Sequence, residues 1–190
     1  MLKLYYPFKP FVIAQKWGNP NPMYKDNGFT FDRHNGIDAN KGSGRDSNRF
    51  PVYCPIENAV VQLVRNVPKG GGNEMWLMTK DRVQIGDKNC FAYMPFSHAE
   101  KVLLPSGYEP KLGELMMIAD STGFSTGPHT HMGLYRIEYD GRNISYLDDN
   151  DANGSSDPEP FFTGEYAVDK ADFPTMLKSV FRYYSYNIGL

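Results

Sequence analysis

Most of the chain alternates between short apolar runs and turn-forming residues. The runs are rich in β-branched and aromatic residues, and Gly, Pro, Asn and Asp separate them. Runs of this length and composition are typical of β-strands. We predict strands at residues 11–15, 59–64, 75–79, 90–96, 114–119, 129–137 and 143–147. Many short strands with intervening turns predict a mainly β domain, built as a sheet or a sandwich.

Clusters of turn-forming residues interrupt this pattern. Residues 18–22 read Gly-Asn-Pro-Asn-Pro, and residues 70–73 read Gly-Gly-Gly-Asn. Asp140 and Gly141 form a dipeptide that is typical of tight β-hairpins. We therefore expect residues 143–147 to be the return strand of a hairpin that turns at this dipeptide.

The last part of the chain has a helical pattern instead. Apolar residues recur there three or four positions apart, at Phe173, Leu177, Val180, Phe181 and Tyr184. With Pro174 near its start and Gly189 after its end, this spacing predicts one amphipathic helix that packs on the domain. We divide the chain accordingly into a β domain, residues 1–162, and a C-terminal extension, residues 163–190.

The composition is that of an ordinary globular protein. The chain has 190 residues, of which 41% are hydrophobic and 22% charged, and its formal net charge is -2. A charge this close to zero argues against binding nucleic acid through a strong positive field. No apolar run is long enough to span a bilayer, so we expect no membrane insertion.

The N-terminus and the cysteines bear on where the protein works. Pro7, Lys9 and Pro10 interrupt the apolar stretch that a secretory signal would need. We therefore expect the protein to be made in the cytoplasm, or to be exported by a route that the sequence does not indicate. Cys54 and Cys90 are too few for a disulfide framework, and both lie in apolar stretches. We expect buried free thiols, although the sequence leaves a disulfide between them open.

The four histidines carry the candidate chemistry. His34 stands four residues before Asp38, a spacing that puts both side chains on one side of an extended segment or of a helix. His129 and His131 lie two residues apart in a predicted strand, so they point to the same face. Histidine nitrogen and carboxylate oxygen both suit zinc. Each pair taken alone, like the isolated His98, also occurs by chance on protein surfaces.

In their order along the chain, these residues resemble the motifs of the lysostaphin-like M23 zinc endopeptidases. Those enzymes have an early His-x-x-x-Asp, an isolated histidine and a late His-x-His, which correspond here to His34 with Asp38, to His98, and to His129 with His131. Further stretches similar to the family are residues 51–55, 58–61, 111–114, 125–131 and 157–161. The resemblance covers about residues 10–162.

The resemblance implies both a fold and a site. The fold would be a mainly β, antiparallel-sheet domain of the lysostaphin-like type. The site would hold Zn²⁺ through His34, Asp38 and His131, three ligands that leave a fourth position for water. A His-Glu-x-x-His motif is absent from the sequence, so histidine would take the place of a glutamate base. His129 would be the general base, and His98 its partner or the oxyanion stabiliser.

The family also implies a substrate, namely peptide bonds in the cross-bridges or stem peptides of bacterial peptidoglycan. Loops at residues 41–48, 67–73 and 120–127 are rich in small residues, and we expect them to wall a narrow groove for an extended peptide. A compact lytic domain of this kind is similar to a phage lysin or a virion-associated peptidase. We therefore expect it to reach the wall after phage-type release or as a virion component.

Other interpretations compete with this one. Two histidines and one carboxylate also hold non-haem iron in oxygenases. A catalytically silent module that binds the cell wall or builds a phage tail could use the same fold. Residues 149–154, Asp-Asn-Asp-Ala-Asn-Gly, match the start of a calcium-binding loop, but Pro160 stands where that loop needs glutamate. We favour a solvated acidic loop there.

Overall fold

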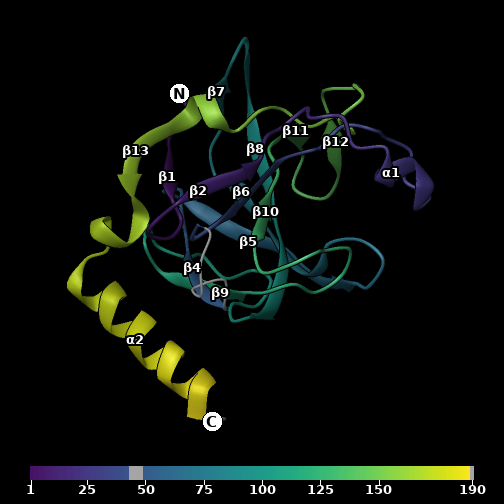
Figure 1. Cartoon of the computed structure of the whole chain (residues 1–190). Coiled ribbons are helices and arrows are strands. Elements are labelled where there is room, and N and C mark those ends of the chain that lie inside the picture. Colours follow the sequence, from purple (N-terminus) through teal and green to yellow (C-terminus); the bar gives the residue numbers. More distant parts are fainter. Residues whose placement is uncertain (43–48, 189–190) are drawn as a thin grey trace.

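The computed structural model of the protein describes residues 1–42 and 49–188. Its strands are β1 (Leu4–Tyr6), β2 (Val12–Gln15), β3 (Ile37–Asn40), β4 (Phe50–Tyr53), β5 (Ala59–Val67), β6 (Gly72–Thr79), β7 (Val83–Ile85), β8 (Lys88–Val102), β9 (Leu115–Ala119), β10 (Thr130–Met132), β11 (Tyr135–Tyr139), β12 (Ile144–Tyr146) and β13 (Phe162–Tyr166). Its helices are α1 (Met23–Asp26) and α2 (Phe173–Ile188), with short 3₁₀ turns η1 (Glu159–Phe161) and η2 (Ala167–Lys170) (Figure 1).

Strand β8 organises the main sheet. It pairs in antiparallel fashion with β6, β7, β9, β10 and β11. The sheet continues from β10 through β3 to β2, and from β11 to β12. A separate parallel ladder joins β1 to β13, so that the start of the chain lies beside residues 162–166. The predicted mainly β, antiparallel architecture is confirmed. The boundary at residue 162 stays a prediction, although β13 ties the following segment to the domain.

The predicted strands agree with β2, β5, β6, β8, β9 and β12, and the hairpin between β11 and β12 forms as expected. The single strand predicted at residues 129–137 is instead two strands, β10 and β11. They are separated at Gly133, where an added Cβ would lie 2.8 Å from Pro95 Cγ. The apolar pattern does not predict β1, β3, β4, β7, β13 or α1, each of which has three to five residues.

A β-bulge near the end of β8 sets the direction of one histidine. His98 has a φ of 66°, in the left-handed region that non-glycine residues rarely adopt. The register between β6 and β8 shifts at this point: Met75 pairs with Phe96, but Asn73 pairs with Ala99. Bulges of this kind re-aim a side chain and occur next to active sites. His98 therefore departs from the alternation of its strand.

The main hydrophobic core includes buried residues of β8 and of the strands that pair with it. Phe96, Met94, Leu77 and Met117 are fully buried there. Cys54 and Cys90 are also buried, and both are free thiols. Burial raises the pKa of the Cys54 thiol to about 12, so this sulfur is unreactive near neutral pH. The described helices lack the combined length and apolarity of a membrane-spanning helix.

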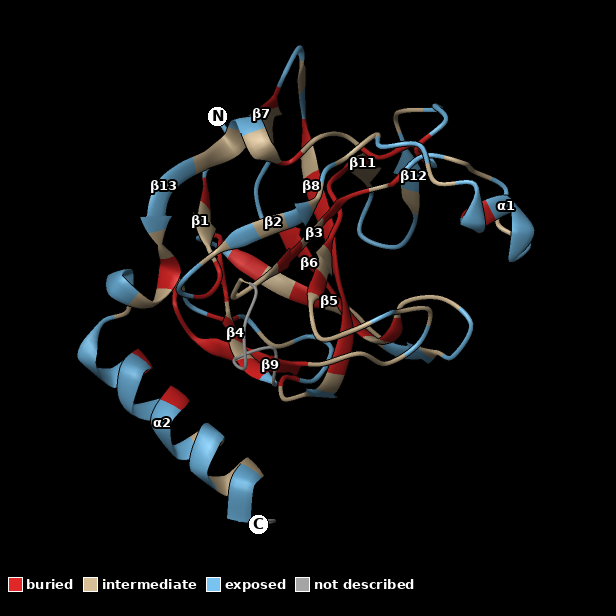
Figure 2. Ribbon diagram, viewed as in Figure 1, coloured by how far each residue is buried: buried red, intermediate tan, exposed pale blue. Residues whose placement is uncertain are grey.

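The predicted C-terminal helix is α2, and its orientation differs from the expectation. Figure 2 shows that most of α2 is exposed and that only a narrow side of it is buried. The buried residues are Thr175 and Ser179, whereas Leu177 and Val180 of the apolar stripe are more than 40% exposed. The helix thus contacts the domain through polar side chains, and its apolar side faces outward.

Candidate metal centre

Two neighbouring strands bring Asp38 and His131 together. Asp38 lies in β3 and His131 in β10, and the register of the two strands pairs these residues directly. Because paired residues of antiparallel strands point to the same face, both side chains project from one side of the sheet. His131 also pairs with Ser97 of β8, so it lies in the interior of the sheet. Sheet register, rather than loop conformation, therefore positions this half of the site.

His34 reaches the same point from the loop before β3. Its backbone N–H donates to Asn19 O at 2.9 Å, and its carbonyl accepts from the Gly18 N–H at 2.8 Å. The turn cluster of residues 18–22 thus holds the histidine in place. The side chain is only 1% exposed, although His34 lies in a loop.

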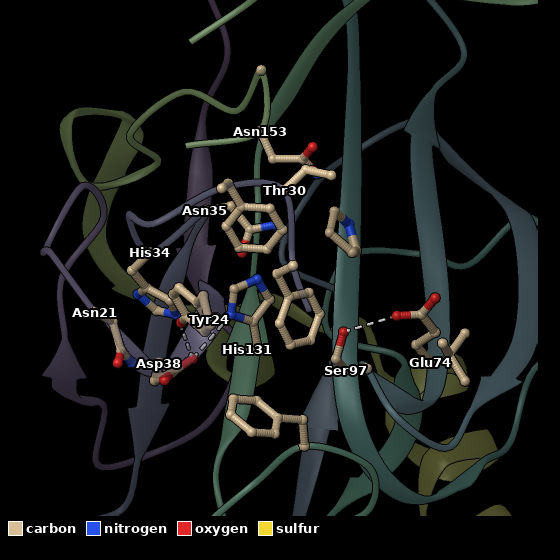
Figure 3. A pocket seen from close by; sticks show the side chains of 18 of the residues that line it. Asn21, Tyr24, Thr30, His34, Asn35, Asp38, Glu74, Ser97, His131 and Asn153 are labelled. Carbon is tan, nitrogen blue, oxygen red and sulfur yellow. Dashed lines mark hydrogen bonds and ion pairs between the residues drawn. The ribbon is translucent and has the colours of Figure 1, made fainter. Parts of the chain in front are cut away.

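The three side chains converge on one small volume (Figure 3). His34 Nε2 lies 3.1 Å from His131 Nδ1 and 3.1 Å from Asp38 Oδ1, and His131 Nδ1 lies 3.0 Å from Asp38 Oδ1. The ligands of a tetrahedral zinc ion, at about 2.0–2.1 Å from the metal, are about 3.3 Å apart. The observed triangle is therefore close to one face of a zinc tetrahedron, and its two nitrogens and one oxygen are donors that zinc accepts.

Contacts behind the ligands fix their orientation. His34 Nδ1–H donates to Lys16 O at 3.1 Å, which leaves the Nε2 lone pair directed at the triangle. The His131 ring lies against Gly36, where an added Cβ would come within 2.8 Å of His131 Nε2 and 2.5 Å of Met132 O. Such outer contacts set the tautomer and orientation of metal-binding histidines. The Gly36 position between the first two ligands therefore has no room for a side chain.

The electrostatics of the triangle favour a charged carboxylate. Burial raises the pKa of Asp38, but the adjacent imidazoles of His131 and His34 outweigh it and hold the pKa well below its usual range. Burial lowers the pKa of His131. Deprotonated ligands are the forms that bind metal.

His98 and His129 lie beside the triangle, with their ring centroids 4.6 Å apart. His129 Nε2 is 3.6 Å from Asp38 Oδ1. His129 Nδ1–H donates to Gly127 O at 2.8 Å, and His98 Nδ1–H donates to Thr122 O at 2.8 Å. Because a carbonyl oxygen can only accept, each ring carries its proton on Nδ1. The Nε2 atom is then the ring nitrogen of each histidine that can accept a proton.

The protonation of His98 follows from its surroundings. Burial lowers its pKa to about 4, with a further contribution from the neighbouring His129 and His131. His98 is therefore neutral near pH 7. A neutral imidazole can hydrogen-bond and accept a proton, but it does not place a fixed positive charge in the site.

A groove of about 1150 Å³ runs over all five residues. Val67, Gly70 and Gly71 of one predicted loop and residues 124–126 of another line it, as expected. The prediction for residues 41–48 is different: residues 41 and 42 do not line the groove, and residues 43–48 lie outside the described part of the chain. Much of the remaining lining comes from within residues 21–35 and 148–154, and strand residues such as Glu74 and Ser97 complete it.

The walls are more aromatic than the sequence suggests. Tyr24, Phe29, Phe31 and Phe124 pack together beside the triangle, with centroids 5.1–6.2 Å apart. The Tyr24 ring also stacks on His34 at 6.3 Å. No sequence motif predicts this cluster, because its residues come from three separate segments: α1, the loop after it and the loop at residues 120–127. The groove is therefore not lined by small residues alone.

A buried carboxylate on the opposite wall also escapes sequence reasoning. Glu74 of β6 is 4% exposed, and Ser97 donates to it at 3.1 Å (Figure 3). Trp76 Nε1–H donates to Glu74 at 3.2 Å, and Arg65 forms an ion pair with it. The ion pair with Arg65 and these two hydrogen bonds thus compensate the Glu74 carboxylate where it borders the groove. Its neighbour Ser97 directly precedes His98.

In the acidic loop at residues 149–154, the side chain of Asn150 holds the turn through hydrogen bonds to the backbone of the same loop. Asn150 Oδ1 accepts hydrogen bonds from the Ala152 N–H at 2.9 Å and the Gly154 N–H at 3.1 Å. Asp151 lies near Arg33, with 3.8 Å between Oδ2 and Nε. These hydrogen bonds of Asn150 form the turn, and the interpretation as a solvated acidic loop stays a prediction.

The chain has distant sequence relatives among metalloproteases. No family profile matches it. It is 29% identical over 142 residues to an uncharacterized metalloprotease of Haemophilus influenzae, covering 75% of this chain and 26% of that protein. A second uncharacterized metalloprotease, from Buchnera aphidicola subsp. Baizongia pistaciae, is 28% identical over 141 residues, covering 70% and 31%. The chain thus spans about a quarter to a third of the length of these relatives.

Solved structures establish the fold. The catalytic domain of the antimicrobial peptidase lysostaphin from Staphylococcus simulans superposes with a TM-score of 0.55 and 23% identity, over 80% of this chain and 91% of that one. A zinc containing peptidase from Vibrio cholerae gives 0.52 and 21%, over 78% and 41%. A chain of the SpoIIQ–SpoIIIAH pore forming complex gives 0.55 and 14%, over 90% and 96%. The protein therefore has the predicted lysostaphin-like fold, with a His-Asp-His cluster suited to a metal.

Proposed function

We propose that this protein is a zinc metalloendopeptidase of the lysostaphin-like M23 type and that it hydrolyses peptide bonds in bacterial peptidoglycan. One observation carries the proposal: His34, Asp38 and His131 form a triangle with edges of 3.0–3.1 Å at the groove, and His98 and His129 border it. Three ligands suit a catalytic zinc, since a structural zinc normally has four. The distant relatives named as metalloproteases and the zinc containing peptidase of similar fold support this proposal.

The chemistry divides between the metal and the two further histidines. A zinc ion bound by His34, Asp38 and His131 would polarise the scissile carbonyl and lower the pKa of a bound water to about 7. His129 Nε2 would accept the proton of the attacking water and pass it to the leaving amine. Its Nδ1–H bond to Gly127 O holds the ring in the tautomer that this role requires.

His98 has a different role in this proposal. Its pKa of about 4 makes it neutral at pH 7, and its ring lies against His129. Because its Nδ1–H is donated to Thr122 O, the neutral ring presents only an acceptor at Nε2, so we assign His98 to supporting His129 rather than to stabilising the oxyanion, with the β-bulge aiming its side chain at the site. His129 is the better candidate for the base, because its Nε2 is 3.6 Å from the carboxylate oxygen of the triangle.

The test is digestion of purified peptidoglycans that differ in their cross-bridges. Zinc-loaded protein should release fragments with new peptide amino termini, which mass spectrometry identifies and which name the bond. A His131→Ala variant and a chelator should both abolish the release. Intact walls of every type, in the presence of stoichiometric zinc, would contradict the peptidoglycan substrate. Cleavage of unrelated unstructured peptides in the same samples would keep the peptidase and reject only its proposed target.

A non-catalytic role on the same fold is the main alternative. The similarity to a chain of a pore forming complex, with a TM-score of 0.55, means that this fold alone does not establish hydrolysis. The complete set of ligands and both further histidines favour the enzyme. Binding of zinc and of cell walls without the release of new amino termini would favour the alternative.

We also propose that the enzyme works as a phage lysin or as a component of a virion. This part rests on the sequence expectations alone. Mass spectrometry of purified virions from a producing culture should detect the protein in the particle if it is a virion component. Its presence only in the lysate would favour a lysin, and its production in cells without any prophage would contradict both.

A further inference from the structure

Helix α2 attaches to the domain through a stripe of polar side chains. At 100° per residue, Thr175, Ser179, Arg182 and Tyr186 lie on one side of the helix. The Leu115 N–H donates to Ser179 Oγ at 2.9 Å. Arg182 Nη1 donates to Glu114 Oε1 at 2.9 Å and to Leu115 O at 3.0 Å. These contacts fix which side of α2 faces β9.

The opposite side of the helix is apolar and open. Its large side chains are each 41–68% exposed, although they belong to residue types that usually form cores. They are Phe173, Met176, Leu177, Val180, Phe181, Tyr183, Tyr184 and Ile188. We call this surface the outer face of α2; it appears as the exposed length of the helix in Figure 2.

The size of the outer face is that of a protein–protein interface. A large side chain offers roughly 150–250 Å² when fully open, so these half-exposed residues present on the order of 800 Å². The largest apolar patch of a typical monomer is about 300–600 Å². A stable complex buries about 800 Å² on each partner. The outer face therefore exceeds an ordinary surface patch and is large enough for one stable contact.

The lack of charged residues on the outer face favours contact with a second copy of the chain. None of its eight residues is charged, so two copies related by a two-fold axis would not oppose like charges. The helix is 16 residues and about 24 Å long, which allows two copies to pack side by side along their whole length. Helices that lie on anionic membranes are instead rich in cations. The two cations of α2 are Lys178 and Arg182, and Arg182 is paired with Glu114.

We propose that the protein forms a two-fold symmetric dimer in which the outer face of α2 packs against the same face of a second copy. The candidate metal centre lies outside this contact, so each subunit keeps its own groove. The proposal does not depend on peptidase activity.

Sedimentation velocity tests the dimer. The wild-type protein should change from monomer to dimer as its concentration rises from about 1 µM to about 1 mM. Val180→Asp places a charge in the middle of the outer face and should raise the dissociation constant at least 100-fold. Lys178→Asp is the matched control: it introduces the same acid on an exposed flank of the same helix, and it should leave the dimer within a few-fold of the wild type. Far-UV circular dichroism verifies that α2 persists in both variants.

Several outcomes would overturn the proposal. A wild-type protein that stays monomeric at every concentration would reject it, and so would a dimer that Val180→Asp does not weaken. Tyr184→Lys provides a second disruption, because each copy would then carry an unpaired charge into the apolar contact. If the monomer instead co-sediments with vesicles of anionic phospholipid, and Val180→Asp abolishes that binding, the outer face is a membrane surface rather than a dimer interface.

Discussion

The metal centre and helix α2 use polar side chains in opposite ways. At the metal centre, buried polar residues point away from the sheet into a groove, and strand pairing holds them there. In α2, the polar residues Ser179 and Arg182 point inward and attach the helix to the domain, while apolar residues face outward. An apolar stripe therefore predicts that a helix forms, but it does not predict which side meets the domain. A change at the metal centre should thus alter chemistry, whereas a change under α2 should alter stability.

The largest effect is expected from removing a ligand. His131→Ala should lower zinc stoichiometry well below one and reduce hydrolysis by more than the 10–100-fold that is typical of losing an outer-shell contact. Metal analysis by mass spectrometry and the peptidoglycan digest measure the two losses. Lys178→Ala, far from the groove, should change neither of them. A His131→Ala protein that keeps both zinc and activity would show that the triangle is not the metal site.

The second effect separates binding of the metal from catalysis. His129→Ala should retain zinc and lose about 10²–10⁴-fold in kcat, as expected for the loss of a general base. The counterpart His98→Ala should also retain zinc. Since His98 becomes protonated only below its pKa of about 4, the wild-type activity that depends on neutral His98 should persist at pH 7 and fall as the pH approaches 4. Rate profiles against pH for the wild type and both variants measure the losses in kcat and the fall in activity toward pH 4. Near-full activity in both would refute the assignment of these histidines.

A smaller effect is expected from a change behind a ligand. Gly36→Ala would bring a methyl group within 2.8 Å of the His131 ring and 2.5 Å of Met132 O. Overpacking of this kind typically costs about 1–3 kcal/mol, and displacing His131 should also weaken zinc binding. Gly127→Ala is the matched control, because its Cβ would meet no atom within 4 Å. Chemical denaturation and zinc titration compare the two. Equal behaviour would mean that the site relaxes around the added methyl group.

The smallest effect concerns the attachment of α2. Glu114 is 1% exposed and accepts hydrogen bonds from Tyr108 at 2.6 Å and from Arg182 at 2.9 Å. Although burial raises the pKa of Glu114, its hydrogen bonds outweigh this and lower the pKa below the ordinary value of 4.5. The folded protein thus favours the charged form. The resulting stabilisation is complete above the unfolded pKa and is lost as the pH falls through the folded pKa.

Glu114→Gln makes this contribution measurable. At pH 7 the variant should lose about 2 kcal/mol of unfolding free energy, the usual range for a hydrogen bond to a charged group. The difference from the wild type should shrink as the pH falls below the folded pKa, since the wild-type carboxyl is then protonated as well. Urea denaturation at several pH values checks this. A difference that does not depend on pH would point to a packing effect instead of the ion pair.

The sequence by itself determined the class of the fold and the candidate ligands. Alternating apolar runs predict most of the long strands, because burial on one face imposes that pattern locally. The spacings of His34 with Asp38 and of His129 with His131 are local as well, and together with His98 they carry the resemblance to lysostaphin-like enzymes. The tertiary structure places all five residues around one site, although their catalytic roles stay a prediction.

Only the tertiary structure decided how distant segments meet. The pairing of Asp38 with His131 depends on the register between β3 and β10, and the aim of His98 on a bulge in β8, neither of which has a local signal. The aromatic wall around Tyr24 joins segments a hundred residues apart. The outward turn of the apolar side of α2 follows from contacts with β9, such as that of Ser179. Packing between distant segments sets these features, and the local pattern of apolar and polar residues does not contain that information.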